Sequence, residues 1–268
     1  MNVSCRKTYL IGVTGAFLIA VGVWLSGCAT EYNLATNQEE SYLITDAREV
    51  ALGAKLAKRV ENKFPMIWDD RLLDKVISTG EALGRASDRN ELIYHFGIID
   101  EEDLNAFAIP GGFVYVNRGL LEEATDDELA CVLAHEIGHI AAKHSIKRLQ
   151  SALGFTFLKV FAAMEVEDHR YYQNADMALN ELLLAYSRKD ELEADRLAVK
   201  YVKAAGYHPE AMISFFDKLD EIHNKKPSRI YRYQRTHPYI DDRRRVVRQE
   251  IFGQNSFLDY MNKTSDAF

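Results

Sequence analysis

The sequence has no surplus of basic residues, no internal repeat and no low-complexity segment. Its 268 residues carry 33 lysines and arginines against 40 aspartates and glutamates, which gives a formal net charge of -7 at pH 7. A chain with this balance lacks the broad cationic surface that holds a phosphate backbone, so we expect no nucleic-acid partner. Its length and its 47% hydrophobic content suffice for one principal domain with a buried core.

Cysteine is also scarce, and most of it lies in the N-terminal segment. Arg6 and Lys7 precede an uncharged stretch over residues 8–27, which leads into Leu-Ser-Gly-Cys ending at Cys28. This pattern resembles the export signal and lipobox of bacterial lipoproteins. The resemblance implies that residues 1–27 are a signal peptide and that Cys28 becomes the lipidated first residue. Because Ala29 is not an aspartate, it also implies the periplasmic side of the outer membrane. The alternative is an uncleaved membrane anchor over the same stretch.

This processing would leave the chain without an internal disulfide. There are three cysteines in all. Cys5 would leave with the signal and Cys28 would carry lipid, so Cys131 has no partner in the same chain. Cys131 lies in an apolar helical run, where a small buried hydrophobic residue is expected rather than a nucleophile.

The rest of the chain predicts a tether, one folded domain and a short tail. Residues 28–44 are polar and show no periodicity, which indicates a flexible tether. Residues 45–250 alternate helical patterns with short strand-like runs and form the predicted domain, and residues 251–268 give no structural signal. The pattern predicts an α+β fold that is predominantly helical. Helices are expected over 46–62, 72–83, 126 to beyond 144, and 178–205, and strands over 92–99 and 113–117.

The strongest chemical motif lies on the third of these helices. Thr125 and Glu128 form a capping-box sequence at its start. His135 and His139 are four residues apart, so both imidazoles lie on one face and can reach one zinc ion. Glu136 lies between them and can take a proton from a water that attacks a peptide carbonyl. The plain alternative is an amphipathic helix with two exposed histidines.

A third ligand has to come from elsewhere in the chain. A third histidine on the same segment is excluded, because Ser145 stands at that position and His144 is predicted to point away from the ligand face. Downstream, Glu191 and Asp195 are four residues apart on one helical face. One of them can bind the metal while the other orients a ligand histidine. Glu193 is predicted to point away as part of a solvated stripe.

Four motifs in order resemble one known family. They are the sequence from His135 to His139, the sequence from Glu191 to Asp195, the segment 105–112 (Asn-Ala-Phe-Ala-Ile-Pro-Gly-Gly), and Thr-His-Pro at 236–238 followed by Arg243. Together they resemble the M48 zinc peptidases, over about residues 46–247.

The resemblance implies a zincin-like metallopeptidase domain with one zinc ion per chain. His135, His139 and Glu191 would bind the zinc, and Glu136 would be the general base. Asp195 would contact a metal ligand without binding the metal itself. It also implies that His237 approaches the metal or the developing oxyanion and that Arg243 helps to hold the site. The plain alternative for His237 is a turn residue before Pro238.

The segment 105–112 and the strand after it could bind substrate. If the strand over 113–116 lies at a sheet edge beside the metal, an extended peptide can pair with its backbone. The residues expected to contact substrate are Asn105, Ala106, Phe107, Gly111 and Gly112.

The leading hypothesis is therefore a zinc-dependent endopeptidase that acts on unfolded or misassembled envelope proteins. The alternative is a chaperone-like or binding lipoprotein whose zinc site is closed. A latent enzyme lies between the two, with His237 or the region 152–180 filling the open metal position. Iron is disfavoured, because an iron oxygenase has no use for Glu136 at that place in the motif.

Overall fold

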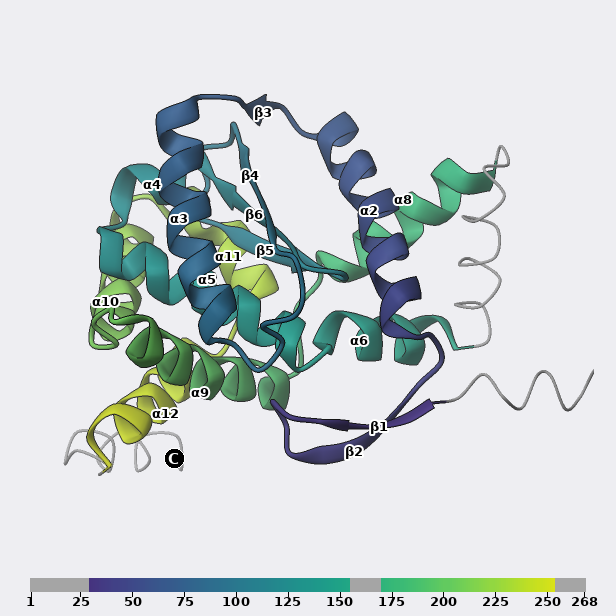
Figure 1. The fold of residues 1–268 in the computed structure, drawn as a ribbon. Helices are drawn as coiled ribbons and strands as arrows, with labels where there is room; N and C mark the ends of the chain where they lie inside the picture. The colour runs from purple at the N-terminus through teal and green to yellow at the C-terminus, as the bar shows by residue number, and fades with distance from the viewer. Residues whose placement is uncertain (1–28, 155–169, 254–268) are drawn as a thin grey trace, which may run out of the picture.

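The computed structural model describes residues 29–154 and 170–253, and its predominantly helical α+β architecture confirms the predicted fold class (Figure 1). The strands are β1 (Ala29–Asn33), β2 (Gln38–Tyr42), β3 (Met66–Ile67), β4 (His95–Ile99), β5 (Ala106–Ile109) and β6 (Phe113–Asn117). The helices of the first half are α2 (Asp46–Lys63), α3 (Asp70–Ala86), α4 (Arg118–Glu123), α5 (Asp126–Ala141) and α6 (His144–Leu153). Those of the second half are α8 (Arg170–Leu182), α9 (Arg188–Ala205), α10 (Ala211–Lys225), the 3-10 turn η1 (Pro227–Ile230), α11 (Tyr231–Thr236) and α12 (Ile240–Phe252).

The main sheet has the strand order β3-β4-β6-β5, with β4 and β6 parallel and the other pairs antiparallel. The sequence predicted β4 and β6 but not β5, whose four apolar residues show no alternation. β6 lies inside the sheet, so the condition that residues 113–116 form a sheet edge is not met. The edge strand next to the zinc-motif helix is β5.

Alternate residues of the strands face two separate cores. Ala106 and Ala108 of β5 pack with Val114 of β6 in the core that contains α3, α5 and α9. Phe107 and Tyr115 face the opposite way, into a core shared with α2, α6 and α8. Figure 1 shows these helices on the two sides of the sheet. The period of two along a strand therefore places β5 between both helical layers.

Helix α5 packs tightly against α9 at a glycine. A Cβ atom on Gly138 would lie 2.9 Å from the Ala194 carbonyl oxygen, closer than real Cβ atoms come. The absence of a side chain at Gly138 therefore permits the approach that brings the two helices together.

Two predicted helices are each shorter than expected. The helix from residue 126 ends at Ala141, because Lys143 adopts a left-handed conformation with φ of 54° before α6 begins. The helix expected over 178–205 is divided between α8 and α9, and Ser187 caps α9 in a capping box with Asp190. Long-range packing overrides the helical periodicity at both positions.

The prediction of a flexible tether over 28–44 is wrong for most of that segment. β1 and β2 form an antiparallel hairpin, which ion pairs join to the start of α6. Lys143 Nζ lies 2.8 Å from Glu31 and 2.6 Å from Asp46, and Lys147 Nζ lies 2.5 Å from Glu40. These partners are 97 to 112 residues apart in the chain, so no local pattern reveals them.

The predicted signal peptide, the lipidation site Cys28 and most of the predicted tail lie outside the described residues. Within the described ranges, no helix combines the length and hydropathy that a membrane span requires. Cys131 is free and buried, in agreement with its expected role as a small core residue.

Candidate metal centre

Helix α5 carries both motif histidines into the interior. Its first turn is fixed by the predicted capping box, in which Thr125 and Glu128 satisfy each other's backbone donors. From Leu129 onward every residue of the helix is buried, so the exposed-histidine alternative is wrong. The Nε2 atoms of His135 and His139 lie 3.0 Å apart.

Helix α9 brings the two predicted acids to the same point. Glu191 Oε1 lies 3.5 Å from His139 Nε2, and Glu191 Oε2 lies 3.5 Å from His135 Nε2. Asp195 Oδ1 lies on the other side of His135, 2.8 Å from Nδ1. A carboxylate in that position fixes the orientation of an imidazole and leaves Nε2 free as a ligand.

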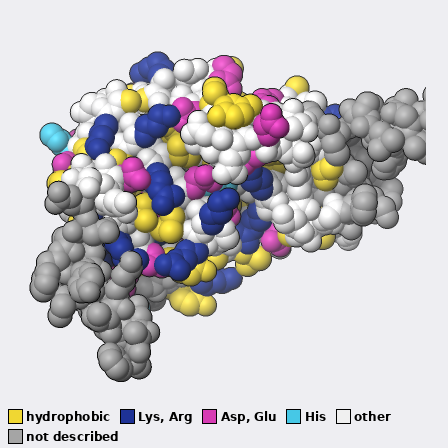
Figure 2. Space-filling view, turned by 90° about the horizontal axis from the view of Figure 1, so that it is seen from below, with side chains coloured by type: hydrophobic (Ala, Val, Ile, Leu, Met, Phe, Trp, Pro, Cys, Tyr) yellow, Lys and Arg dark blue, Asp and Glu magenta, His cyan; other side chains and the backbone are white. Residues whose placement is uncertain are grey.

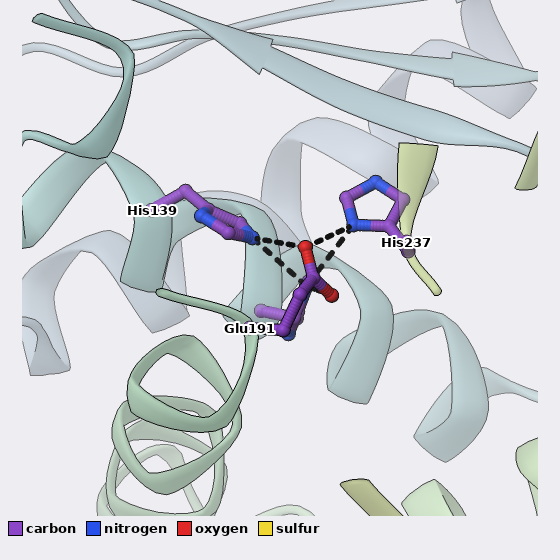
Figure 3. A group of neighbouring side chains, drawn as sticks. His139, Glu191 and His237 are labelled. Atoms are coloured by element: carbon purple, nitrogen blue, oxygen red, sulfur yellow. Dashed lines mark hydrogen bonds and ion pairs between the residues drawn. The ribbon is translucent and has the colours of Figure 1, made fainter. Parts of the chain in front are cut away.

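A third histidine joins this group from the loop after α11. His237 Nδ1 lies 3.3 Å from His135 Nε2 and 3.2 Å from Glu191 Oε1. Figure 3 shows the His139 and His237 rings pointing toward the Glu191 carboxylate from opposite sides. Each of the four residues His135, His139, Glu191 and His237 offers one ligand atom within 4.8 Å of the others, and all four are buried.

The donor set fits a small tetrahedral cation. Ligand atoms at about 2.0–2.1 Å from a tetrahedral zinc ion are about 3.3 Å apart. The contacts of 3.0 to 3.5 Å that His135, His139 and His237 make with one another or with one of the two Glu191 oxygens agree with that spacing, and the four donor atoms all lie within 4.8 Å of one another. Imidazole and carboxylate are also ligands that zinc accepts. The cluster can therefore hold a metal ion, with four donors where the sequence predicted three and an open position.

Glu136 lies beside the cluster without belonging to it. Its Oε1 atom is 3.4 Å from His237 Nε2, and its Oε2 atom is buried without a hydrogen-bond partner in the described residues. Buried carboxylate oxygens normally have partners, so this one indicates a place for a water or substrate group. That location suits the predicted general base.

Arg243 holds the two acids from α12. Its guanidinium is 1% exposed and donates to both Asp195 carboxylate oxygens at 2.9 Å. A further guanidinium nitrogen lies 3.2 Å from Glu191 Oε2. Bidentate pairs of this kind combine charge with fixed geometry. Arg243 thereby offsets part of the negative charge behind the ligand cluster.

The pKa values of the buried groups follow from these contacts. Burial alone would raise the pKa of Glu191, but the charges of His237 and Arg243 hold it well below its ordinary value. Burial likewise opposes the ionised Asp195, and Arg243 and His135 lower its pKa. Burial and Arg243 act to lower the pKa of His135, yet Asp195 and Glu191 outweigh them and raise it to about 9. Both acids are thus ionised, and a metal ion has to displace a proton from His135.

Sequence reasoning missed His144, which was expected to point away from the site. It is outside the four-donor group, but its Nδ1 lies 2.9 Å from Nδ1 of His139. Its Nε2 lies 3.2 Å from Glu193 Oε2, so the prediction that Glu193 is only a solvated acid is wrong. One proton assignment satisfies both contacts: His139 donates from Nδ1 to His144, and His144 donates from Nε2 to Glu193.

Tyr186 is a second residue that the sequence did not indicate. Its ring stacks on His139 with a centroid distance of 4.0 Å. Its hydroxyl lies 2.9 Å from Ser145 Oγ, so the ring is held from the far side. His144 begins α6 directly after the left-handed Lys143, and Tyr186 lies in the loop before α9, so no local sequence pattern indicates either contact.

The predicted substrate residues separate into two groups. Ala106 lies in the site, since its carbonyl oxygen is 3.4 Å from His237 Nε2. Asn105 is next to it and accepts a hydrogen bond from Thr236 at 3.2 Å, and Phe107 follows on the same strand. By contrast, the turn after β5 holds Gly111 and Gly112.

This turn contacts α2 and the loop before β4 rather than the metal ligands. Gly111 and Gly112 have φ values of 80° and 95°, which other residues rarely adopt. The Gly111 N–H donates to the buried carboxylate of Glu49 at 3.2 Å. Ideal Cβ atoms on the two glycines would meet the backbone of Val50 and of Ile93. The geometry gives both glycines a structural role in the turn.

Comparison with known proteins gives matches over the same region. The profile of Peptidase family M48 matches residues 71–251. A putative beta-barrel assembly-enhancing protease of Vibrio cholerae is 30% identical over 215 residues, which cover 75% of this chain and 43% of that protein. The metalloprotease LoiP of Escherichia coli K12 is 26% identical over 247 residues, covering 88% of this chain and 96% of that protein. The chain thus spans less than half of the first relative and nearly all of the second.

Proposed function

Because the chain belongs to Peptidase family M48, we propose that it is a zinc-dependent endopeptidase that cleaves unfolded or misassembled proteins of the cell envelope. The observation that carries this proposal is the convergence of His135, His139 and Glu191 on one point beside the buried carboxylate oxygen of Glu136, which has no partner among residues 29–154 and 170–253. Such a grouping matches the needs of metal-assisted peptide hydrolysis.

Each residue of the site has a distinct task in this reaction. His135, His139 and Glu191 would hold zinc, which when bound would supply Lewis acidity and a nucleophile at neutral pH. Glu136 accepts the proton of the attacking water on its free oxygen and returns a proton to the leaving amine. Asp195 orients His135, and Arg243 keeps Asp195 and Glu191 ionised and in place.

The edge strand β5 supports binding of an extended substrate. Asn105, Ala106 and Phe107 adjoin His237, and a peptide paired with this backbone would pass the ligand cluster. Backbone pairing reads no particular sequence, so it favours unfolded chains over folded ones. One relative, of Escherichia coli K12, is named a beta-barrel assembly-enhancing protease, which agrees with an envelope substrate. The N-terminal pattern at Cys28 supports attachment to the periplasmic side of the outer membrane.

The test of this function uses a single atom change at Glu136. Zinc-loaded wild-type protein should cleave unfolded casein, and Glu136→Gln should retain zinc but lose cleavage by at least about a hundredfold, the range of a lost general base. Zinc content measured by atomic emission on both proteins is the control for metal loss. Equal cleavage by the two proteins would refute the role of Glu136.

A specific observation also favours a latent form of this enzyme. His237 supplies a fourth donor, and its ring contacts the Ala106 carbonyl that a substrate strand would need. Ala106 is fully buried in this arrangement. His237 would then leave the cluster when substrate enters. The chaperone-like alternative differs, since in that protein the fourth donor would stay in place.

Substitution of His237 separates these possibilities. If His237 only closes the site, His237→Ala should raise the rate of casein cleavage. If it also stabilises the oxyanion, the KM should fall while kcat drops about a hundredfold or more, the effect of losing one such donor. An inactive wild type whose His237→Ala variant is also inactive, with zinc bound in both, would favour the binding protein.

A further inference from the structure

A cavity of about 330 Å³ lies beside the candidate metal centre. We call it the Arg235 cavity; Phe64, Phe107, Leu183 and Leu184 form its apolar wall, and Asn105 and Arg235 are among its polar lining residues. Asn105 precedes Ala106, whose carbonyl oxygen contacts His237. The cavity therefore opens within one residue of the site on β5.

An unpartnered donor points to a ligand at this cavity. Asn105 is 1% exposed, and its Oδ1 atom accepts the hydrogen bond of Thr236. Its Nδ2 atom is buried and has no hydrogen-bond partner in the part of the chain that the structure describes. A buried amide N–H without a partner is unfavourable, so an oxygen of a bound ligand would satisfy it.

The charge of the cavity has one sign. Among the described residues none that line it is acidic, although acids outnumber bases in the whole chain. Arg232, also in the lining, is paired with Glu101 and with Asp103 at 3.2 Å. Arg235 has no carboxylate partner within residues 29–154 and 170–253, and its guanidinium lies 5.7 Å from the centre of the Tyr231 ring.

A second cation stands at the rim of the cavity. Lys63 Nζ donates to Asn180, another lining residue, at 3.0 Å and lies 5.9 Å from the centre of the Phe64 ring. The nearby Asp176 is engaged by Arg59 through two hydrogen bonds of 2.6 Å. An acidic ligand in the cavity would thus meet Arg235, with Lys63 as a second cation next to the lining residues Asn180 and Phe64.

A second cavity of similar size has the opposite charge. A cavity of about 390 Å³ between α3 and the β3 side of the sheet is lined by Glu61 and Glu81 and by no lysine or arginine. On the face shown in Figure 2, basic side chains lie among acidic ones. The Arg235 cavity therefore differs from that cavity in the sign of its lining charge.

We propose that the Arg235 cavity is a substrate subsite that selects an aspartate or glutamate side chain at one position of the extended chain. The methylene groups of a glutamate would pack on the rings of Phe64 and Phe107, and its carboxylate would meet Arg235 and the free Asn105 amide. The volume admits any side chain, so charge rather than size provides the selection. This inference rests on the proposed peptidase function and adds a substrate preference to it.

The first test measures binding without catalysis. On the Glu136→Gln background, pairs of labelled peptides that differ only in Glu or Gln at one position are titrated by fluorescence anisotropy. At one position the Glu peptide should bind about twofold to fivefold more tightly, the gain of an exposed ion pair, and salt should reduce the gain. Arg235→Gln should bring the ratio to one, and Arg235→Glu should favour a Lys peptide instead.

A matched control is Arg85→Gln, which removes an exposed arginine of α3 whose side chain is 70% exposed. It should leave the Glu to Gln ratio unchanged. A ratio of one at every position, or the same ratio in Arg235→Gln as in its parent, would overturn the proposal. The salt series excludes a purely apolar preference, because apolar contacts do not weaken with salt.

The second test reads cleavage, and it separates this inference from the proposed function. Fragments of a denatured protein mixture cleaved by the wild type should carry an acidic residue at one fixed distance from the cut, and Arg235→Glu should replace it with a basic one. Cleavage without any charge bias would refute the acidic subsite but would still support the proposed peptidase function. Charge-biased binding in a protein that never cleaves would support the subsite and contradict the proposed peptidase function.

Discussion

Removal of the Arg243 guanidinium tests how the buried acids of the site are held. In Arg243→Met the side chain keeps its length, but Asp195 loses two hydrogen bonds of 2.9 Å and Glu191 loses a cation at 3.2 Å. Both acids are completely buried, so no water replaces the lost partner. Breaking a buried ion pair from one side typically costs about 3–5 kcal/mol of unfolding free energy.

The neighbouring Arg244 provides the matched control. Its ion pairs with Asp217, Asp220 and Asp241 are on the surface, where those carboxylates are 57 to 85% exposed. Exposed pairs contribute at most about 1 kcal/mol each because solvent screens them. Arg244→Met should therefore destabilise the protein less than Arg243→Met, although the two changes are chemically identical.

Urea unfolding of both variants, with zinc and with a chelator, measures the difference. The loss of unfolding free energy in Arg243→Met should be largest with chelator, because a bound cation also neutralises Glu191. It should shrink as the pH falls, since Asp195 and Glu191 have lowered pKa values in the wild type, and their contribution is lost when acid protonates them. Equal deficits in the two variants at pH 7 would refute the claim that Arg243 compensates buried charge.

Three further predictions concern the same site. Zinc binding at pH 7.5 should release at least one proton, because the pKa of His135 is raised to about 9 and the ligand form is neutral; calorimetry in buffers of different ionisation enthalpy would contradict this if the heats agree. His144→Ala should weaken zinc binding about tenfold to a hundredfold in a chelator competition, whereas the exposed His223→Ala should not change it. Gly138→Ala should lower the free energy of unfolding by about 1–3 kcal/mol, because the new methyl group meets the Ala194 carbonyl; a thermal shift of zero would show that α5 and α9 can separate freely.

The sequence predicted those parts of the fold that local patterns determine. Apolar periodicity located α2, α3 and α5, and the capping box at Thr125 located the start of the metal helix. The family resemblance is confirmed by the match over residues 71–251. The hairpin of β1 and β2 was missed because its residues are polar and its order depends on Lys143, a residue about a hundred positions away. β5 was missed because four apolar residues without alternation do not separate a strand from a buried loop.

In the candidate site, too, local patterns predicted some residues, whereas long-range contacts determined the position of others. Glu191 and Asp195 were found because a four-residue spacing on one helix places two acids on one face, whatever the rest of the fold does. His144 was misjudged because helical geometry was extended past Ala141, and the left-handed Lys143 resets the direction of the chain there. That conformation is unfavourable for lysine, and the two ion pairs of its ammonium group to Glu31 and Asp46 offset the cost. The orientation of His144 toward His139 thus follows a turn whose ion pairs come from distant parts of the chain, which no periodicity within α5 or α6 could show.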